Sequence, residues 1–514
     1  MDEKDLNKLS KVITENLRVQ RDGYKLVPYI DVSNVLVDVS ARQNHVIFAR
    51  RGCGKTLLLH HSTNSLTKEI RTIYLNCEDF KKHSFPNVLI EILDALFEEL
   101  ENNLISWFGK KKRSRVLIRE IRKDLQALRE QEDKQIRDIR ESESTSSQDV
   151  LEVAINATVG GVGAKAGGNI NDYRKREFEQ IYKISEEKIE KLDLLLPNVK
   201  RQIRKFFELS SEVKSVYLQI DDFYHLVRAD QPIVTDYIHR LCKDLPIYFK
   251  IATLKHASTL YIDKDGQPIG AQERHDYQPI DIDFTFSDLN RTIEQNRRIF
   301  REFGKLAGIN PSEIDGLFKG EGFERLIIAG GGVPRDCLSL FLEVLKIVRA
   351  PQGDGRIGKD DVRIQSRSNF ERRIEELKQD SDKNEQGALI KGIYVIRQFC
   401  IDRGTSVILI PELVLQQEDN IRHLLYRLLD YRIIHSAGSA LTHKSQPGTY
   451  RAFVIDIGCY AHMRVLKGRF NEIDLTDTKA KEKMRSAPIF DKNSFSKLWG
   501  NAPEDIEEGL KQQG

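Results

Sequence analysis

The stretch HVIFARRGCGKT, residues 45–56, decides the fold expected for this chain. A short apolar run, 45–49, leads into a glycine-rich turn, and the residues that follow Lys55 have helical spacing. The segment from Ala49 to Thr56 matches the phosphate-loop pattern G-x-x-x-x-G-K-[ST] at every required position except the first, where Ala49 replaces glycine. A strand, a glycine turn and a helix in this order predict a loop that binds nucleotide phosphates.

Each position of this loop has an expected role. Gly52 and Gly54 let the backbone aim its N–H groups at the phosphates, Lys55 reaches the β- and γ-phosphates, and the Thr56 hydroxyl coordinates Mg²⁺. The residues expected to bind the nucleotide are Ala49, Arg50, Arg51, Gly52, Cys53, Gly54, Lys55, Thr56 and Leu57. A second glycine-rich stretch, 160–168, lacks the preceding strand and the G-K-[ST] ending, which favours an ordinary flexible segment.

The wider pattern predicts an α/β core of the P-loop type, a mainly parallel sheet with helices on both faces. Apolar strand candidates at 45–49, 72–78, 215–222 and 247–253 alternate with helix-like segments. Each strand ends in polar residues, and the carboxyl ends of parallel strands are where open α/β sheets bind ligands.

Three of these polar positions, and a fourth further along the chain, are candidate catalytic or metal-binding residues. Asp221 is expected to hold Mg²⁺ and Asp222 to orient and deprotonate the attacking water. Thr253 ends the next strand, where it either senses the γ-phosphate or is a plain polar strand end. Arg335 lies where GGGVPRD begins a helix, and either touches the γ-phosphate or forms a surface salt bridge.

A chain of 514 residues predicts several domains. The core is expected at 1–99 and 201–284, and 100–200 is interpreted as a helical, coiled-coil insertion whose apolar seam contains Ile118, Ile121, Leu125 and Leu128. A helical lid is expected at 285–380, a winged-helix-like domain at 386–465 and a polar, loosely held tail at 466–514. Pro197 is expected to mark a kink or a restart within the insertion.

Composition narrows the classes of partner. With 81 basic and 78 acidic side chains the formal net charge is +3, so bulk charge does not require a nucleic-acid partner. The six cysteines form no C-x-x-C pair, and no apolar stretch reaches membrane-spanning length. These features predict a cytoplasmic protein with no membrane contact.

The segment 386–465 has the order of a winged helix, with three helices followed by a hairpin. Such a domain either reads duplex DNA, with its third helix in the major groove, or binds a protein. The residues expected to contact DNA are Arg422, His423, Arg427, Lys444 and Arg451.

Together, ARRGCGKT, LQIDDF, the strand end at Thr253 and GGVPRD resemble AAA+ ATPases of the Orc1/Cdc6 and STAND-like branch, in particular bacterial Orc1/Cdc6-like proteins. The resemblance covers about 25–100 and 205–465, and implies ATP and Mg²⁺ as ligands. It assigns Lys55 and Thr56 to Walker A, Asp221 and Asp222 to Walker B, Thr253 to sensor 1 and Arg335 to sensor 2, with the base pocket around Tyr29 and Val32. Ala49 departs from the family pattern, and Arg274 is the candidate for an arginine finger that acts across a subunit interface.

Three functions fit these features. The first is a Mg²⁺-dependent ATP-hydrolysing switch, slow or partner-stimulated, that acts on DNA or a protein partner, with a homo-oligomer as the alternative partner. The second is a STAND-like sensor that holds ATP with little turnover, as a component of a bacterial antiviral defence complex would. The third is a DNA-binding regulator that works through its winged helix.

Overall fold

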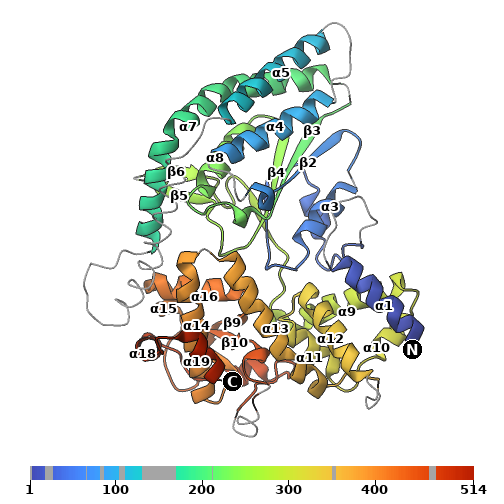
Figure 1. The fold of residues 1–514 in the computed structure, drawn as a ribbon, viewed down its shortest axis with the longest axis vertical. Coiled ribbons are helices and arrows are strands. Elements are labelled where there is room, and N and C mark those ends of the chain that lie inside the picture. The colour runs from blue at the N-terminus through green and yellow to red at the C-terminus, as the bar shows by residue number, and fades with distance from the viewer. Residues whose placement is uncertain are drawn as a thin grey trace.

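The computed structural model describes residues 3–513 except 18–26, 65, 81–85, 103–109, 130–169, 211, 265, 350–354, 382, 462 and 464–469. An α/β part, shown in the upper half of Figure 1, lies against a largely helical part below it. Among the described helices, none is both long enough and apolar enough to cross a membrane.

The centre of the α/β part is a parallel sheet with the strand order β2-β3-β4-β1-β7. Its strands are β1 (His45–Phe48), β2 (Ile70–Asn76), β3 (Ser215–Asp221), β4 (Ile247–Thr253) and β7 (Gln278–Asp281). The register pairs Asn76 with Asp221, and Phe48 with both Thr253 and Asp281, so the strands end at one edge. The sheet confirms the predicted α/β core and adds β7, which was not expected.

Helices cover both faces of this sheet because successive strand residues point to opposite sides. Val46 and Phe48 pack with α4 (Asn87–Asn102) and α8 (Gln231–Cys242), whereas Ile47 packs with α2 (Val35–Val39) and α3 (Lys55–Asn64). Beside the sheet, β5 (Tyr261–Lys264) and β6 (Gln267–Gly270) form an antiparallel hairpin. Short 3₁₀ turns follow two strand ends, η1 (Cys77–Phe80) after β2 and η2 (Phe223–His225) after β3.

Of two long helices, α5 (Lys110–Arg129) packs along α4, and α7 (Ile170–Leu209) packs on α5 and continues down the side of the α/β part (Figure 1). The predicted seam residues Ile118, Ile121, Leu125 and Leu128 are buried in the same apolar cluster as α4, α7 and one face of the sheet. The described ends of the region 100–200 therefore form an outer layer of the core. Helix α7 continues through Pro197, so no new helix starts there. The glycine-rich stretch 160–168 lies outside the described residues.

The helical part begins after the sheet and is joined by the first helix of the chain. It contains η3 (Phe286–Asp288), α9 (Leu289–Leu306), α10 (Pro311–Asp315), α11 (Gly322–Ala329), α12 (Pro334–Val348) and α13 (Lys359–Asp380). Leu6, Leu9 and Ile13 of α1 (Glu3–Asn16) are buried in the apolar cluster that these helices build. The N-terminal helix thus packs on the helical part.

The C-terminal part contains the three helices and the hairpin that the sequence predicts, together with a strand that it does not predict. Its elements are α14 (Lys383–Asp402), β8 (Val407–Pro411), α15 (Glu412–Gln417), α16 (Asp419–Asp430), β9 (Ile434–Thr442), β10 (Thr449–Ile455), η4 (Ile457–Cys459), α17 (Ala480–Met484), α18 (Lys492–Gly500) and α19 (Ile506–Gln512). The missed strand β8 pairs with β10 in an antiparallel sheet of order β8-β10-β9.

The expectation of a loosely held tail is wrong for the segment around α18. Trp499 is 0% exposed, and Phe490 and Phe495 are also buried in the large apolar cluster shared with α14. The three aromatic side chains anchor this segment because removing so much apolar surface from water outweighs the polarity of its neighbours.

Candidate functional site

The phosphate loop has the backbone conformation that its glycines predict. Gly52 has φ +90° and Gly54 has φ +92°, a region that other residues adopt only with strain. A Cβ atom at Gly52 would lie 2.9 Å from Cγ1 of Val333, which leaves no room for a side chain. Ala49 is absent from the described residues with positive φ, so its conformation does not require glycine. The departure at the first pattern position is therefore sterically tolerated.

Lys55, Thr56 and Asp221 meet where the loop passes the end of β3. The Lys55 ammonium turns back to the carbonyl oxygens of Ala49 at 3.1 Å and Arg50 at 3.5 Å. The Thr56 hydroxyl donates a hydrogen bond to the Asp221 carboxylate at 2.5 Å, and the Tyr74 hydroxyl donates to the same oxygen at 2.8 Å. Burial, with the neighbouring charge of Asp222, raises the pKa of Asp221 above its ordinary value. These oxygen atoms are the ligand type that Mg²⁺ prefers, so the donor set fits that ion.

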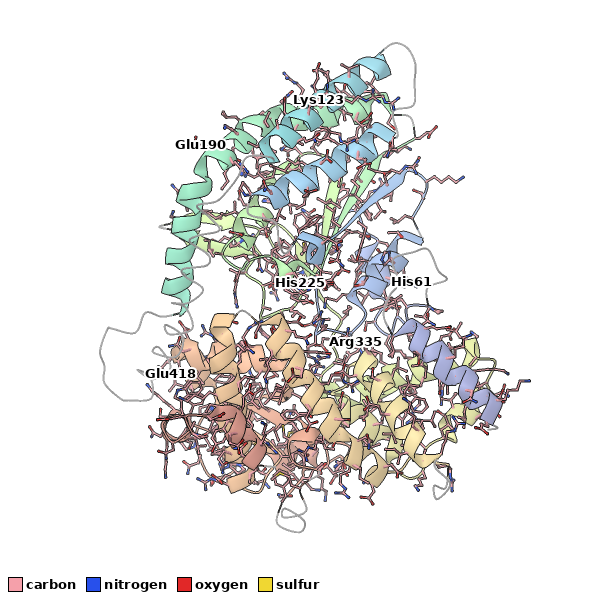
Figure 2. All side chains as sticks on the ribbon, in the orientation of Figure 1. His61, Lys123, Glu190, His225, Arg335 and Glu418 are labelled. Atoms are coloured by element: carbon pink, nitrogen blue, oxygen red, sulfur yellow. The ribbon has the colours of Figure 1, made fainter. Side chains whose placement is uncertain are left out.

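Asp222 lies at the turn that follows β3, beside two residues that were not predicted as site residues. Its φ is +49°, and its N–H donates to Oδ1 of Asp221 at 2.9 Å. One ligand atom each of Glu78, Asp222 and His225 lie within 4.8 Å of one another. Glu78 follows β2, a different strand, so no local motif links it to the acidic pair. Figure 2 labels His225 at the lower edge of the sheet, facing the helical part that carries Arg335.

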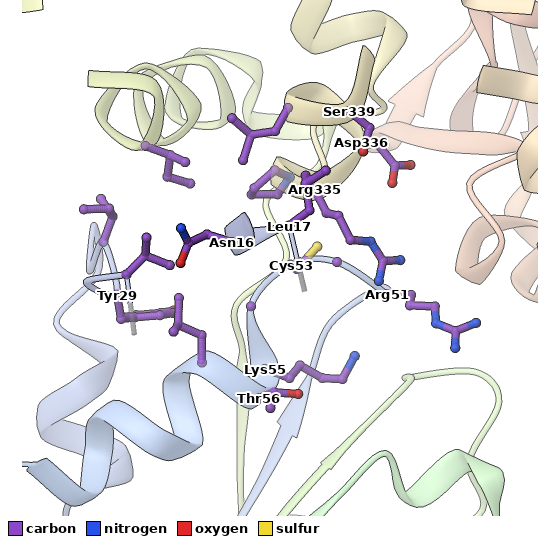
Figure 3. Close-up of a pocket in the computed structure, with 18 of the residues that line it drawn as sticks. Asn16, Leu17, Tyr29, Arg51, Cys53, Lys55, Thr56, Arg335, Asp336 and Ser339 are labelled. Atoms are coloured by element: carbon purple, nitrogen blue, oxygen red, sulfur yellow. The ribbon is translucent and has the colours of Figure 1, made fainter. Parts of the chain in front are cut away.

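A cavity of about 720 Å³ opens above the loop, between the sheet and the helical part. Lys55, Thr56, Asp222 and Glu78 line it from the sheet side, and Arg335 lines it from α12. In Figure 3 the side chains of Lys55, Arg51 and Arg335 extend toward the same open region. Lys55, Arg51 and Arg335 beside the phosphate loop suit this side of the cavity to a polyanion, while carboxylates that include Glu78 and Asp222 line the same cavity.

Arg335 contacts the phosphate loop directly from α12. Its backbone N–H lies 3.4 Å from the Gly52 carbonyl oxygen, and a Cβ at Gly52 would meet its side chain at 3.0 Å. Burial lowers the pKa of Arg335, which the nearby carboxylate of Asp336 partly offsets. No side chain in the described part of the chain forms an ion pair with Arg335. The guanidinium is therefore free to bind an anion in the cavity.

Thr253 is placed at the base of the loop. Its side chain is 0% exposed and its hydroxyl shares a hydrogen bond with that of Ser258. Its carbonyl oxygen accepts from the Ala49 N–H at 3.3 Å. Thr253 thus supports the start of the loop from the neighbouring strand, and it is not among the residues that line the cavity.

One of the two residues expected to form the base pocket lines the cavity. Tyr29 lines the cavity, together with Val27, Pro28 and Ile30, whereas Val32 does not. Asn16 and Leu17, at the end of α1, line the same region and were not predicted (Figure 3). Their sequence neighbourhood carries no motif, and only the packing of α1 on the helical part brings them to the cavity.

The two arginines inside the phosphate loop connect it to other parts of the chain. Arg50 forms a two-pronged ion pair with Asp283, at 2.7 and 2.8 Å, and its Nη1 lies 3.3 Å from Nδ1 of His435 on β9. Arg51 forms an ion pair with Asp380 at the end of α13. Arg50 and Arg51 stand at positions where the phosphate-loop pattern accepts any residue. Arg51 contacts α13, and Arg50 contacts the C-terminal part.

Behind these contacts lies a buried network of charges. Arg432 is 1% exposed and donates to both carboxylate oxygens of Asp336 at 2.9 Å and to the carbonyl oxygen of Arg51 at 3.3 Å. Arg373 donates to Asp336 at 3.2 Å and pairs with Asp456. Burial alone would raise the pKa of Asp336, but Arg432 and Arg373 hold it below its ordinary value. The residue after Arg335 is therefore an ionised link between α12, α13 and the C-terminal part.

The residues predicted to contact DNA do not form one exposed patch. Arg427 is 6% exposed and pairs with Glu385 at 3.0 Å, and His423 lies 3.1 Å from the same carboxylate. The others are distributed over separate partners, Arg422 with Asp419, Arg451 with Glu412 and Lys444 with Glu482. The side chain of Tyr426 packs on His256 of the α/β part at 4.4 Å between ring centroids. Helix α16 is thus turned toward the α/β part.

Arg274, the candidate finger, lies in the loop between β6 and β7. Its side chain is 81% exposed and lies 3.8 Å from Glu273, and its φ is +66°. It does not line the cavity of its own chain.

No protein-family model and no curated protein matches this sequence. Among solved structures, a Walker-type ATPase of Pyrococcus abyssi is 14% identical, with 90% of this chain and 96% of that chain covered and a TM-score of 0.39. A signal-transduction ATPase of the STAND class with a tetratricopeptide-repeat sensor, from Pyrococcus horikoshii, is also 14% identical. It is covered over 42% of its own length and 85% of this chain, with a TM-score of 0.26. At these TM-scores the similarity to either structure supports no conclusion about fold or function. The description of the phosphate loop depends on the geometry of this chain alone.

Proposed function

We propose that this chain binds ATP with Mg²⁺ in the cavity above the phosphate loop, hydrolyses it, and uses the nucleotide state as a switch. The observation that carries the proposal is the joint placement of Lys55, Thr56 and Arg335 around one cavity, with Asp221 beneath Thr56. Each group has the charge and position that triphosphate binding requires.

The residues divide the work of the reaction. Lys55 leaves its loop carbonyls to contact the β- and γ-phosphates, while Arg335 binds the γ-phosphate from α12. Thr56 and Asp221 hold Mg²⁺, which when bound neutralises charge on the phosphate oxygens. Asp222, one residue beyond Asp221, orients the attacking water. The acidic pair at the strand end thus serves both the metal and the nucleophile.

The switch rests on the contacts of Arg51. Its ion pair with Asp380 joins the phosphate loop to α13, and its side chain also lines the nucleotide cavity. A bound phosphate competes with Asp380 for this guanidinium, so nucleotide binding loosens the contact between the loop and α13. In this proposal the helical part is a lid and the C-terminal part a winged-helix-like unit that moves with it. The moving unit acts on DNA or on a protein partner.

A second candidate function is a sensor that holds ATP with little turnover. The contacts between the C-terminal part and the phosphate loop favour it. His435 lies within hydrogen-bond distance of the Arg50 guanidinium, and Arg432 donates a hydrogen bond to the Arg51 carbonyl oxygen. In this candidate function, a partner must break these contacts before the C-terminal part can move away from the phosphate loop. Arg274, exposed on its own chain, is then available to act as a finger across a subunit interface.

Replacing Lys55 with Ala tests the site. Loss of a charge-assisted contact to phosphate is expected to weaken ATP binding by about 2–3 kcal/mol, roughly 30- to 150-fold. Lys68→Ala is the matched control because Lys68 is exposed and lies outside the cavity. Equilibrium binding of a labelled ATP analogue measures the effect, and equal affinity of Lys55→Ala and the unmodified chain contradicts the proposal.

Turnover separates the two candidate functions. Phosphate release is measured with and without duplex DNA at two salt concentrations, because contacts to DNA phosphates weaken with salt. Steady turnover supports the switch, and salt-sensitive stimulation by DNA identifies DNA as the partner. Tight ATP binding with turnover below one per hour supports the sensor. Asp222→Asn is expected to keep ATP binding and lose turnover.

A further inference from the structure

Glu78 and Asp222 lie at the wall of the cavity above the phosphate loop, close to His225. One ligand atom of each lies within 4.8 Å of the other two, and Glu78 and Asp222 both line the cavity with Lys55 and Thr56. We propose that Glu78 is the carboxylate that takes the proton from the attacking water. Asp222 orients that water, and His225 lies beside both carboxylates. This inference rests on the proposed hydrolysis of ATP and names a catalytic residue that the acidic motif does not contain.

The fold explains how Glu78 reaches this position. Strand β2 runs parallel to β3, and their register pairs Asn76 with Asp221 at the ends of the two strands. The chain then turns into η1, where the Glu78 N–H donates to Oδ1 of Asn76 at 2.8 Å. This hydrogen bond fixes the turn that follows β2. Glu78 is therefore held one strand away from Asp222, at the same edge of the sheet.

Asp222 alone is poorly placed to perform both tasks. Its φ of +49° and the hydrogen bond from its N–H to Asp221 fix its backbone against the carboxylate that holds Mg²⁺. Its side chain is one methylene shorter than glutamate, which limits its reach toward the γ-phosphate. Glu78 has the extra methylene and approaches from the neighbouring strand. A base must lie within hydrogen-bond reach of the proton it takes, and Glu78 lines the same cavity as Lys55 and Arg335 with the longer of the two carboxylate side chains.

The step balances with the groups present and the substrate proposed above. The water oxygen forms a bond to the γ-phosphorus while the bond from that phosphorus to the β–γ bridging oxygen breaks. The water proton passes to the Glu78 carboxylate, the bond electrons leave with ADP, and Lys55 and Arg335 stabilise the charge on the phosphoryl oxygens. Glu78 then loses its proton to solvent or to the product phosphate, which restores the carboxylate.

Glu78→Gln in the full chain tests this role, with phosphate release and ATP affinity both measured in the presence of Mg²⁺. Glutamine keeps the length of the side chain but accepts no proton, so kcat is expected to fall by about 10²- to 10⁴-fold while Kd for ATP stays within about twofold. Glu69→Gln is the control, because Glu69 precedes the same strand and pairs with Lys214 on the protein surface. This control is expected to leave kcat and Kd unchanged.

A conservative variant separates chemistry from structure. Glu78→Asp keeps the carboxylate at a shorter reach and is expected to recover more turnover than Glu78→Gln. The inference is overturned if Glu78→Gln keeps the kcat of the unmodified chain, if it loses ATP binding, or if Glu78→Asp is no more active than Glu78→Gln. An unmodified chain that binds ATP without any turnover refutes the proposed hydrolysis itself, which is a different failure.

Discussion

Replacing Arg432 with Met removes the centre of the buried charge network. Methionine has a similar volume and no charge, so the packing is largely kept while Asp336 loses both of its 2.9 Å hydrogen bonds from Arg432. Asp336 retains Arg373 at 3.2 Å, but Glu376 loses its ion pair with Arg432. Breaking a buried ion pair from one side costs about 3–5 kcal/mol, because a charge is left without compensation.

Unfolding can be followed in the C-terminal part, which contributes Arg432 and Asp456 to the network. The chain contains two tryptophans, and in a Trp107→Phe background the fluorescence reports on Trp499, which is fully buried in the C-terminal part. With a slope of about 3 kcal/mol per M urea, the loss of about 3–5 kcal/mol lowers the midpoint of this transition by about 1–1.7 M.

The control is Arg367→Met, which breaks an exposed ion pair on α13. Arg367 and Glu371 are 52% and 59% exposed, and such a pair contributes about 0–1 kcal/mol. The variant Arg432→Met with Glu376→Gln removes the carboxylate that has lost its ion pair and is expected to recover part of the lost stability. A midpoint for Arg432→Met equal to that of Arg367→Met would show that the network does not stabilise the C-terminal part, and the reasoning would fail.

Further changes test separate features of the structure. Gly52→Ala forces a Cβ to within 2.9 Å of Val333 at a φ of +90°, so ATP affinity is expected to fall by about 1–3 kcal/mol in equilibrium binding; unchanged affinity would show that the loop relaxes freely. Trp499→Ala is expected to destabilise the C-terminal part by about 3–5 kcal/mol, measured by circular dichroism in urea, and a smaller loss would mean that the tail contributes little. Burial lowers the pKa of His435 to about 4, so the unfolded chain binds the proton first and stability falls as pH drops from about 6.5 to about 4. His435→Gln removes that part of the acid sensitivity, whereas the exposed control His275→Gln leaves the pH profile unchanged; identical profiles for both variants would contradict the assignment.

The features that the sequence predicts best are local. The loop from Ala49 to Thr56 and the strand that ends at Asp221 are each specified by neighbouring residues, through apolar runs and glycines with required φ values. Strand β7 was missed because QPID is short and half polar. Its Pro279 is tolerated because β7 lies at the edge of the described sheet, where it pairs with β1. That pairing depends on residues far away in the sequence.

Buried polar residues were the hardest to predict. Arg432 and His435 look like surface residues in the sequence, since isolated cations near a strand are usually exposed. Their burial follows from carboxylates on other elements, Asp336 on α12 and Asp456 after β10. Glu78 was missed for the same reason, because Asp222, which lies near it, follows a different strand. The tail did offer a signal, since Phe495 and Trp499 stand four residues apart on one helix face.

The phosphate loop serves two purposes with different residues. The residues that the pattern specifies include Lys55 and Thr56, which line the cavity, and Thr56 also donates a hydrogen bond to Asp221. The identity of these residues is set by the proposed phosphate and metal binding. The positions that the pattern leaves open hold Arg50 and Arg51. Each pairs with an aspartate, and the two pairs differ in solvent exposure. Asp283 is nearly buried and follows β7, so the Arg50 pair belongs to the α/β part, whereas Arg51 and Asp380 remain 29% and 18% exposed between the loop and α13. The partly solvated pair is the weaker of the two, and both of its residues line the cavity. If a bound phosphate draws Arg51 away from Asp380, as proposed, the loop loses that contact to α13 while the Arg50–Asp283 pair remains, and the proposed nucleotide switch would use this asymmetry.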